Sequence, residues 1–357
     1  MNHKIVTLFM ITLFLLLPLS SFSAETAAVE KTEANESPWL FTPLVSSAPK
    51  FGTSIGAMAA YLHAFDEDSP TSTFGLMAQY SNSESLMGGA FGRTYFDHDR
   101  QRLIAGTFFG EINNEYSDFQ GIGYPVNTTD NIHAIFVRYT YRVTDNWFFG
   151  PQIISTDYAI TGNDWFSQQV LALVGLTGFD SNGLGLVAER DTRDNQNSPS
   201  TGSLINMNNV AYRKSFGGDT SFDAYTLKYS SFFAHGDGHV LAARVDGRWT
   251  HNAPPSGYSS IRLRGYTMGQ ELAPHSTLME VEERYHIKGR WGSTAFIGAE
   301  CLYGGDRSCD ESENWFPSIG GGITFALKPE EKMIARTEVA IGKGENQGFY
   351  MKFGYEF

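Results

Sequence analysis

The chain has 357 residues, of which 41% are hydrophobic, 14% aromatic and 18% charged, and its formal net charge at pH 7 is −13. The apolar content excludes a largely disordered chain, two cysteines cannot cross-link a disulfide scaffold, and the negative charge argues against nucleic acid as a partner. The charged fraction lies below the ~25% of ordinary soluble domains, which predicts a surface that does not face only water.

The N-terminal segment has the pattern of an export signal. Lys4 provides a positive charge, Ile5 to Leu17 is apolar, and Ser21-Phe22-Ser23 supplies small residues at a cleavage point. We therefore predict a signal peptide over residues 1–23. A retained transmembrane anchor is the alternative, but it would need about 18 to 20 apolar residues. Residues 24–38 are polar and acidic, which predicts a disordered leader before the folded part.

After this leader, apolar and polar side chains alternate with a period of two, the pattern of half-buried strands. In the last predicted strand, Phe353, Tyr355 and Phe357 share an apolar face and Lys352 lies on the opposite face. The same alternation occurs over residues 132–143, 239–251, 278–287 and 333–342.

The polar faces of these predicted strands carry arginines together with carboxylates, and aromatic residues gather near strand ends. A soluble sandwich would bury its apolar faces in a shared core. A membrane barrel would turn its apolar faces to lipid and enclose the charged ones, with aromatic residues at both membrane interfaces. We favour the barrel. Its sheet must be closed, because an open edge would leave backbone groups unpaired in lipid.

The predicted fold class is therefore all-β, a transmembrane antiparallel β-barrel over residues 39–357. At about 10 residues per crossing, roughly 14 to 18 strands fit this length, and we adopt sixteen. The expected location is the Gram-negative outer membrane, with lipid and lipopolysaccharide as partners and the barrel assembly machinery inserting the chain. Phe353, Tyr355 and the terminal Phe357 resemble the C-terminal insertion signal of such barrels; an edge strand that simply ends there is the alternative.

One segment matches the consensus sequence of a catalytic motif. Gly52-Thr-Ser-Ile-Gly56 fits G-x-S-x-G, but a nucleophile elbow needs a strand, a sharp turn and a helix, with further partners elsewhere. We interpret the segment as the start of the first strand, and predict no enzyme. The nine histidines lack the spacing of metal ligands, so no metal and no cofactor are predicted. A hydrolase that uses a serine and a histidine of the barrel wall stays open.

Two motifs resemble one family. Ile261-Arg-Leu-Arg-Gly-Tyr266 is similar to the R-G-F/Y signature loop of the BamA/TamA family, also called the bacterial surface antigen family. The family's D-x-R-D-N…P-x-x-G strand and turn precede it, and the resemblance extends at least from Gly183 to Phe357. The strand-turn residues are Asp191, Arg193, Asp194, Asn195, Pro199 and Gly202.

The connection that carries the R-G-Y tripeptide is longer than a hairpin needs, and such loops are extracellular or fold inward. If it folds inward, the guanidinium of Arg264 must find carboxylates, because arginine keeps its proton. A solvated loop arginine is the alternative. The resemblance implies that Arg264, Gly265 and Tyr266 form a plug and latch inside the barrel.

In the family, the loop arginine pairs with acidic residues on the next two strands. The first match is Glu282, in Glu282-Glu283-Arg284. The second departs from the family, whose F-x-D-x-G reads Phe296-Ile-Gly-Ala-Glu300 here, so that Gly298 occupies the aspartate position. We expect Glu300, on the same face, to substitute for that aspartate.

Cys301 and Cys309 are the two cysteines of the chain. In an oxidising exported setting we predict that they form a disulfide that closes the loop after the strand containing Glu300. A pair of free thiols is the alternative.

The resemblance implies an outer-membrane protein assembly or translocation factor. Family members that assemble barrels carry periplasmic POTRA domains, and the short leader before residue 39 is too small for one. Assembly activity would then need a separate periplasmic partner, or would rest on weak lateral opening between the first and last strands. The alternative is a passive or structural pore or surface antigen without assembly activity.

Overall fold

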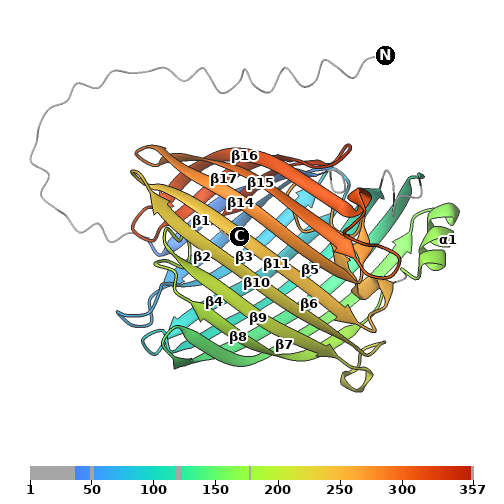
Figure 1. The fold of residues 1–357 in the computed structure, drawn as a ribbon, viewed down its shortest axis with the longest axis horizontal. Coiled ribbons are helices and arrows are strands. Elements are labelled where there is room, and N and C mark those ends of the chain that lie inside the picture. The colour runs from blue at the N-terminus through green and yellow to red at the C-terminus, as the bar shows by residue number, and fades with distance from the viewer. Residues whose placement is uncertain (1–36, 49–51, 117–118, 120–122, 177, 355–357) are drawn as a thin grey trace, which may run out of the picture. The chain divides into compact units, whose positions relative to one another are not determined.

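The computed structural model describes residues 37–48, 52–116, 119, 123–176 and 178–354. Within them, sixteen antiparallel strands close into a barrel (Figure 1), as the alternation predicted. In chain order the barrel strands are β1 (Trp39–Ala48), β2 (Gly52–His63), β3 (Ser72–Ser81), β4 (Leu86–Phe96), β5 (Gln101–Tyr116), β6 (Val126–Thr144), β7 (Trp147–Gly162), β8 (Ser181–Asp191), β9 (Gly202–Tyr212), β10 (Phe222–His235), β11 (His239–His251), β14 (His275–Lys288), β15 (Trp291–Tyr303), β16 (Trp315–Lys328), β17 (Met333–Ile341) and β18 (Gln347–Phe353).

The remaining elements lie in connections. The helix α1 (Trp165–Val174) joins β7 to β8, and the two-residue strands β12 (Ser259–Ser260) and β13 (Leu272–Ala273) pair between β11 and β14. Among the described residues, 3₁₀ turns cover Lys214–Phe216, Pro255–Gly257 and Ser312–Asn314. In the described part of the chain, no helix is both long and apolar enough to cross a membrane.

The barrel turns its apolar side chains outward. On β14, Met279 and Val281 are 49% and 43% exposed, whereas Glu280 and Glu282 between and beyond them are 2% and 1% exposed. A soluble protein would show the reverse order, because water-facing carboxylates cost nothing to solvate. The apolar side chains therefore face a hydrocarbon exterior and the charged side chains face the interior, as expected for a membrane barrel.

The two ends of the barrel differ in what covers them. Because the strand number is even, the start of β1 and the end of β18 lie on one rim, which we call the terminal rim. The turns β8–β9 and β16–β17 also lie there. The opposite, far rim carries α1 and the connections β11–β14 and β15–β16. Helix α1 starts at the capping carboxylate of Asp164 and ends at Gly175, whose φ is +70°.

The first strand lies earlier than expected. Gly52 to Gly56 opens β2, not the first strand, because β1 already pairs with β2 from Trp39 to Ala48. Pro43 obscures this strand in the sequence. It is tolerated because, among the described residues, β1 pairs with β18 opposite Ser46 and Ser47, so Pro43 lies outside that ladder.

Several predictions fall outside the described residues. The signal peptide over residues 1–23 and residues 24–36 of the predicted leader are among them, and so are Tyr355 and Phe357 of the C-terminal insertion signal. These stay predictions.

Candidate functional site in the barrel lumen

The connection between β11 and β14, residues 252–274, folds into the barrel. Pairing of β12 with β13 closes its base. Its apex then packs on the inner wall, where Ile261 and Leu263 are buried. The apolar cluster that holds it contains Ile261, Leu263, Tyr266, Ala273, Leu278, Leu302 and Phe316. Burial of these side chains offsets the entropy cost of ordering a long loop.

Arg264 lies at the centre of this arrangement. Its Nη1 donates to Oε2 of Glu282 at 2.8 Å and to Oε1 of Glu338 at 2.9 Å. Its Nη2 donates to Glu280. The guanidinium also stacks over the ring of Phe296, with Cζ 3.3 Å from the ring centroid. The loop is thus tied by one side chain to β14, β15 and β17.

Other cations share the same carboxylates. Arg284 donates to Glu282 at 2.9 Å, and Arg336 lies 3.2 Å from Glu338. In a water-poor interior each buried carboxylate must be paired, because an unpaired charge is costly to desolvate. We call this group the latch cluster: Arg244, Arg264, Arg284, Arg336 and Lys352 with Glu280, Glu282 and Glu338.

Gly265 and Tyr266 fix the backbone beside Arg264. Gly265 has a φ of +97°, which favours glycine, and its N–H donates to the hydroxyl of Tyr350 at 2.9 Å. The hydroxyl of Tyr266 donates to the carbonyl of Pro317 and accepts from the N–H of Lys343, each at 2.6 Å. The tripeptide therefore contacts every barrel strand from β14 to β18.

Glu300 does not pair with Arg264, contrary to our expectation. It accepts a hydrogen bond from the backbone N–H of Arg262 at 2.6 Å. Arg264 stacks instead on Phe296, four residues away, which along a strand is about 13 Å. Gly298 lies between them, and a Cβ there would come 3.0 Å from Leu263, so the missing side chain leaves room for the loop. Glu280 and Glu338 take the role assigned to Glu300.

The strand-turn motif orders the β8–β9 turn, residues 192–201. Asp191 accepts from Arg193 and Arg102, each at 2.8 Å. Asp194 accepts from the N–H groups of Ser200 and Thr201 at 2.7 and 3.0 Å. Partial burial raises the pKa of Asp194, but these N–H groups and a neighbouring ammonium lower it further, so the pKa lies below its ordinary value.

The last two motif positions shape the turn itself. Asn195 accepts from the N–H groups of Asn197 and Ser198, each at 2.8 Å. Gly202 has a φ of +91°, and a Cβ there would come 2.1 Å from the carbonyl oxygen of Thr192, so glycine is required.

This turn reaches across the terminal rim. Arg284 donates to the carbonyl of buried Pro199 at 3.2 Å, and Lys332 in the β16–β17 turn lies 2.9 Å from Asp194. Asn197 donates to the carbonyl of Glu331 at 3.2 Å. Arg284 therefore belongs to both motifs, since it also pairs with Glu282 in the latch cluster.

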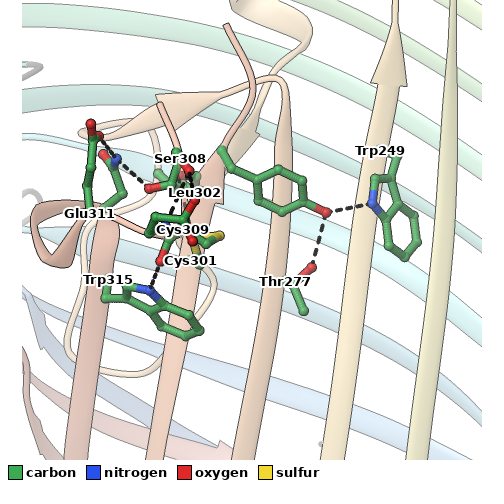
Figure 2. The surroundings of a disulfide bond; sticks show 11 residues. Trp249, Thr277, Cys301, Leu302, Ser308, Cys309, Glu311 and Trp315 are labelled. Atoms are coloured by element: carbon green, nitrogen blue, oxygen red, sulfur yellow. Dashed lines mark hydrogen bonds between the residues drawn. A yellow bond between two sulfur atoms is a disulfide. The ribbon is translucent and has the colours of Figure 1, made fainter. Parts of the chain in front are cut away.

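The predicted disulfide is formed. Cys301 and Cys309 close the β15–β16 connection at the far rim, with Cα atoms 6.0 Å apart (Figure 2). The indole N–H of Trp315 donates to the carbonyl of Cys309 at 2.8 Å, and Asn314 donates to the carbonyl of Ser308 at 2.9 Å. The cross-link thus rigidifies a short loop beside the base of the inward connection.

The G-x-S-x-G segment lies in a wall strand. Ser54 is within β2 between β1 and β3, and its hydroxyl lies 2.7 Å from the hydroxyl of Ser46 and accepts from Gln79. The strand-turn-helix geometry of a nucleophile elbow is therefore not present at this position.

Sequence reasoning missed Glu280, Glu338 and Tyr350 as partners of the loop. Each lies on the polar face of a predicted strand, and that was the available signal. Alternation alone does not say which lumen-facing side chains meet, because that depends on how the barrel closes and how deep the loop reaches.

No protein-family model and no curated protein matches the chain. Solved structures do. CdiB from Escherichia coli has a TM-score of 0.60 at 8% identity, over 89% of this chain and 62% of that one. BamA from Haemophilus ducreyi lacking POTRA domains 1–3 has a TM-score of 0.57 at 11% identity, over 89% and 70%. CdiB from Acinetobacter baumannii has a TM-score of 0.57 at 11% identity, over 88% and 59%.

The chain thus spans about three fifths of the length of the two CdiB structures. At sequence identities this low, the similarity supports a shared fold and nothing more. The expectation from the two sequence motifs is confirmed at that level: this chain has the sixteen-stranded barrel fold of BamA and CdiB.

Proposed function

We propose that this protein is a Gram-negative outer-membrane barrel of the protein assembly or translocation kind, in which residues 252–274 act as plug and Arg264 as latch. The observation that carries the proposal is the burial of Arg264 against three lumenal carboxylates on two strands, because a loop arginine with no such role would stay in solvent. The similarity in fold to BamA and CdiB supports the general kind.

The exterior supports a lipid environment. Apolar side chains face outward along the strands, so lipid and lipopolysaccharide are its expected contacts, and the barrel assembly machinery its expected route of insertion. A separate periplasmic partner would deliver clients at the terminal rim.

The latch would control the opening of the barrel wall at the seam between β1 and β18. Among the described residues, these strands pair opposite Ser46 and Ser47, whereas β1 pairs with β2 from Trp39 to Ala48. Few ladder hydrogen bonds make this the easiest place to open the wall. The docked loop bonds to β18 through Gly265 and Tyr350, so undocking the loop would also release the seam strand.

The second candidate is a passive or structural pore. A lumenal cavity of about 540 Å³, lined by residues of β2–β6 and β8–β10, favours it, since solute could enter without any movement of the wall.

Two measurements separate the candidates. If the first holds, deletion of the gene lowers the levels of other outer-membrane proteins or of a secreted client. Arg264→Glu reproduces the defect, while Met268→Glu, a control at an exposed position of the same loop, does not. Single-channel conductance in planar bilayers, together with unchanged levels of every client tested, would select the pore and overturn the first proposal.

A further inference from the structure

A groove of about 430 Å³ lies on the outer side of the barrel wall, over β4 and β5. Its floor includes the small residues Ala90, Gly92 and Ala105. Phe74 of β3 and Ile135 of β6 border it with bulkier side chains, which are 38% and 44% exposed. A Cβ at Gly92 would come 3.4 Å from the ring of Phe74, so the floor lies directly beside that border.

The groove matches an apolar chain. On β5 its lining extends from Leu103 to Thr107, which corresponds to about 13 Å of strand. Among the described residues, no charged side chain lines it. The hydroxyl of Thr94 in the lining donates to the carbonyl of Leu103 at 3.1 Å, so the wall itself satisfies this polar group. Because this face of the wall meets hydrocarbon, an acyl chain is the occupant that fits.

The end of the groove nearest the terminal rim lies beside tyrosines of β6. Tyr139 pairs with Leu103 of the lining, and its hydroxyl donates to the side chain of Gln101 at 2.8 Å. Tyr141, two residues further along β6, lies on the same outward face. Tyrosines with such polar tips gather at the level of lipid headgroups. The β4–β5 turn, residues 97–100, is therefore at headgroup level, with the groove directly beneath it in the hydrocarbon.

This turn presents a cation and a carboxylate together. Arg100 is exposed, and its Nη2 donates to the hydroxyl of Tyr141 at 2.7 Å, a neutral partner that orients the guanidinium without cancelling its charge. Asp97 is also exposed, and its carboxylate accepts from Gln101 at 3.1 Å. The backbone N–H of Arg100 donates to the carbonyl of Asp97 at 3.0 Å, so both side chains project from one tight turn. A headgroup with a phosphate and an ammonium matches this pair.

The neighbouring β2–β3 turn, residues 64–71, adds negative charge. Its Asp68 lies 2.8 Å from Nδ1 of His98, and its Asp66 accepts from the backbone N–H of His98 at 3.3 Å. Even where a protonated His98 offsets Asp68, the carboxylates of Asp66 and Asp97 remain. A lipid with net negative charge is disfavoured here, whereas a zwitterionic headgroup offers a charge of each sign.

We propose that the groove and the β4–β5 turn bind one zwitterionic phospholipid with a primary ammonium group, from the leaflet at the terminal rim. Arg100 binds its phosphate, Asp97 binds its ammonium and the groove holds one acyl chain. The proposal rests on the outer-membrane location and not on assembly activity. Its failure would leave the latch untouched, because residues 252–274 contact the inner side of the wall.

The test uses the full folded chain in detergent. Native mass spectrometry follows the binding of phosphatidylethanolamine, phosphatidylcholine and phosphatidylglycerol with identical acyl chains. Saturable binding of one phosphatidylethanolamine, several-fold tighter than that of the other two lipids, is the expected result. The quaternary ammonium of phosphatidylcholine has no N–H to donate to Asp97. Glycerophosphoethanolamine, which has no acyl chains, should not displace the bound lipid.

Two variants locate the site. Arg100→Gln should weaken phosphatidylethanolamine binding about tenfold, since it removes a charge-assisted hydrogen bond. Arg290→Gln, in the exposed β14–β15 turn of the same rim, should not. Ala105→Phe fills the floor of the groove and should also weaken binding, whereas Ala295→Phe, at an exposed position of β15, is the matched control.

Heat-modifiable gel mobility shows which variants have folded, and either cavity-side change suffices if the other does not fold. Binding that does not saturate, that is as tight for phosphatidylcholine or phosphatidylglycerol, or that is unchanged in the folded Arg100→Gln and Ala105→Phe barrels overturns the proposal.

Discussion

Replacing Arg264 with methionine tests whether the loop is latched by charge. Methionine keeps most of the side-chain volume but leaves Glu280, Glu282 and Glu338 without their shared guanidinium. These carboxylates are at most 2% exposed, so water cannot replace the lost partner. Removing one member of a buried ion pair costs about 3–5 kcal/mol, which corresponds to roughly two to three and a half orders of magnitude in the loop-docking equilibrium.

Hydrogen exchange measured by mass spectrometry on a peptide spanning residues 256–273 reports that equilibrium. In the native chain the N–H groups of Arg262 and Gly265 are bonded to side chains of the wall and should exchange slowly. In Arg264→Met they should exchange much faster. Met268→Ala is the control, because that side chain lies in the same loop and is 63% exposed. Arg262 is unsuitable, since its guanidinium lies 3.9 Å from the buried carboxylate of Glu300.

A double-mutant cycle isolates the charge term. Glu338→Gln removes one carboxylate of the latch cluster, so adding Arg264→Met to it should cost less than adding it to the native chain, by about 0.5–3 kcal/mol. Equal exchange of the peptide in native and Arg264→Met barrels, both correctly folded, would refute the latch. Strict additivity in the cycle would refute the pairing with Glu338.

Three further predictions concern the rims and the wall. Replacing Cys301 and Cys309 with serine opens a disulfide with a sequence separation of 8, and should lower the free energy of unfolding in urea by about 2.5 kcal/mol. Gly298→Ala should lower the thermal midpoint because its Cβ would meet the carbonyl of residue 279 at 2.8 Å, whereas Gly92→Ala, with 3.4 Å to the nearest atom, should change it little. Because the pKa of Asp194 is lowered, its ionised carboxylate stabilises the folded β8–β9 turn above the pKa of the unfolded chain, about 3.9, and this stabilisation is lost as pH falls through the folded pKa. Hydrogen exchange in the turn should therefore become faster in acid, and Asp194→Asn should abolish that pH dependence.

The barrel could be predicted because the signal for it lies in the order of neighbouring residues along each strand. Apolar and polar residues alternate along each strand, as Met279, Glu280 and Val281 do, and a period of two assigns opposite faces without any knowledge of neighbouring strands. β1 was misplaced because Pro43 interrupts its pattern. The proline is tolerable because, in the described part of the seam, β18 pairs with β1 at Ser46 and Ser47 and not at Pro43.

Partners across the lumen could not be assigned in this way. Glu300 shares a face with Phe296, which made it a reasonable partner for Arg264, but the depth of the loop places the guanidinium over Phe296 and gives Glu300 to the backbone of Arg262. Likewise, Arg284 joins the two motifs because the β8–β9 turn bends over the terminal rim. The alternation of apolar and polar residues in the sequence does not predict that bend.

Residue order by itself determined which side chains face inward, that the sheet must close, and where the two motif-bearing connections lie. Tertiary structure alone decided that Glu280 and Glu338 receive the loop arginine and that Arg284 joins the two motifs. The side of the sheet on which a side chain lies follows from its place in the alternation of consecutive residues. Contact across the lumen depends instead on strand stagger and on how deep the loop reaches, and both are set only when the barrel closes.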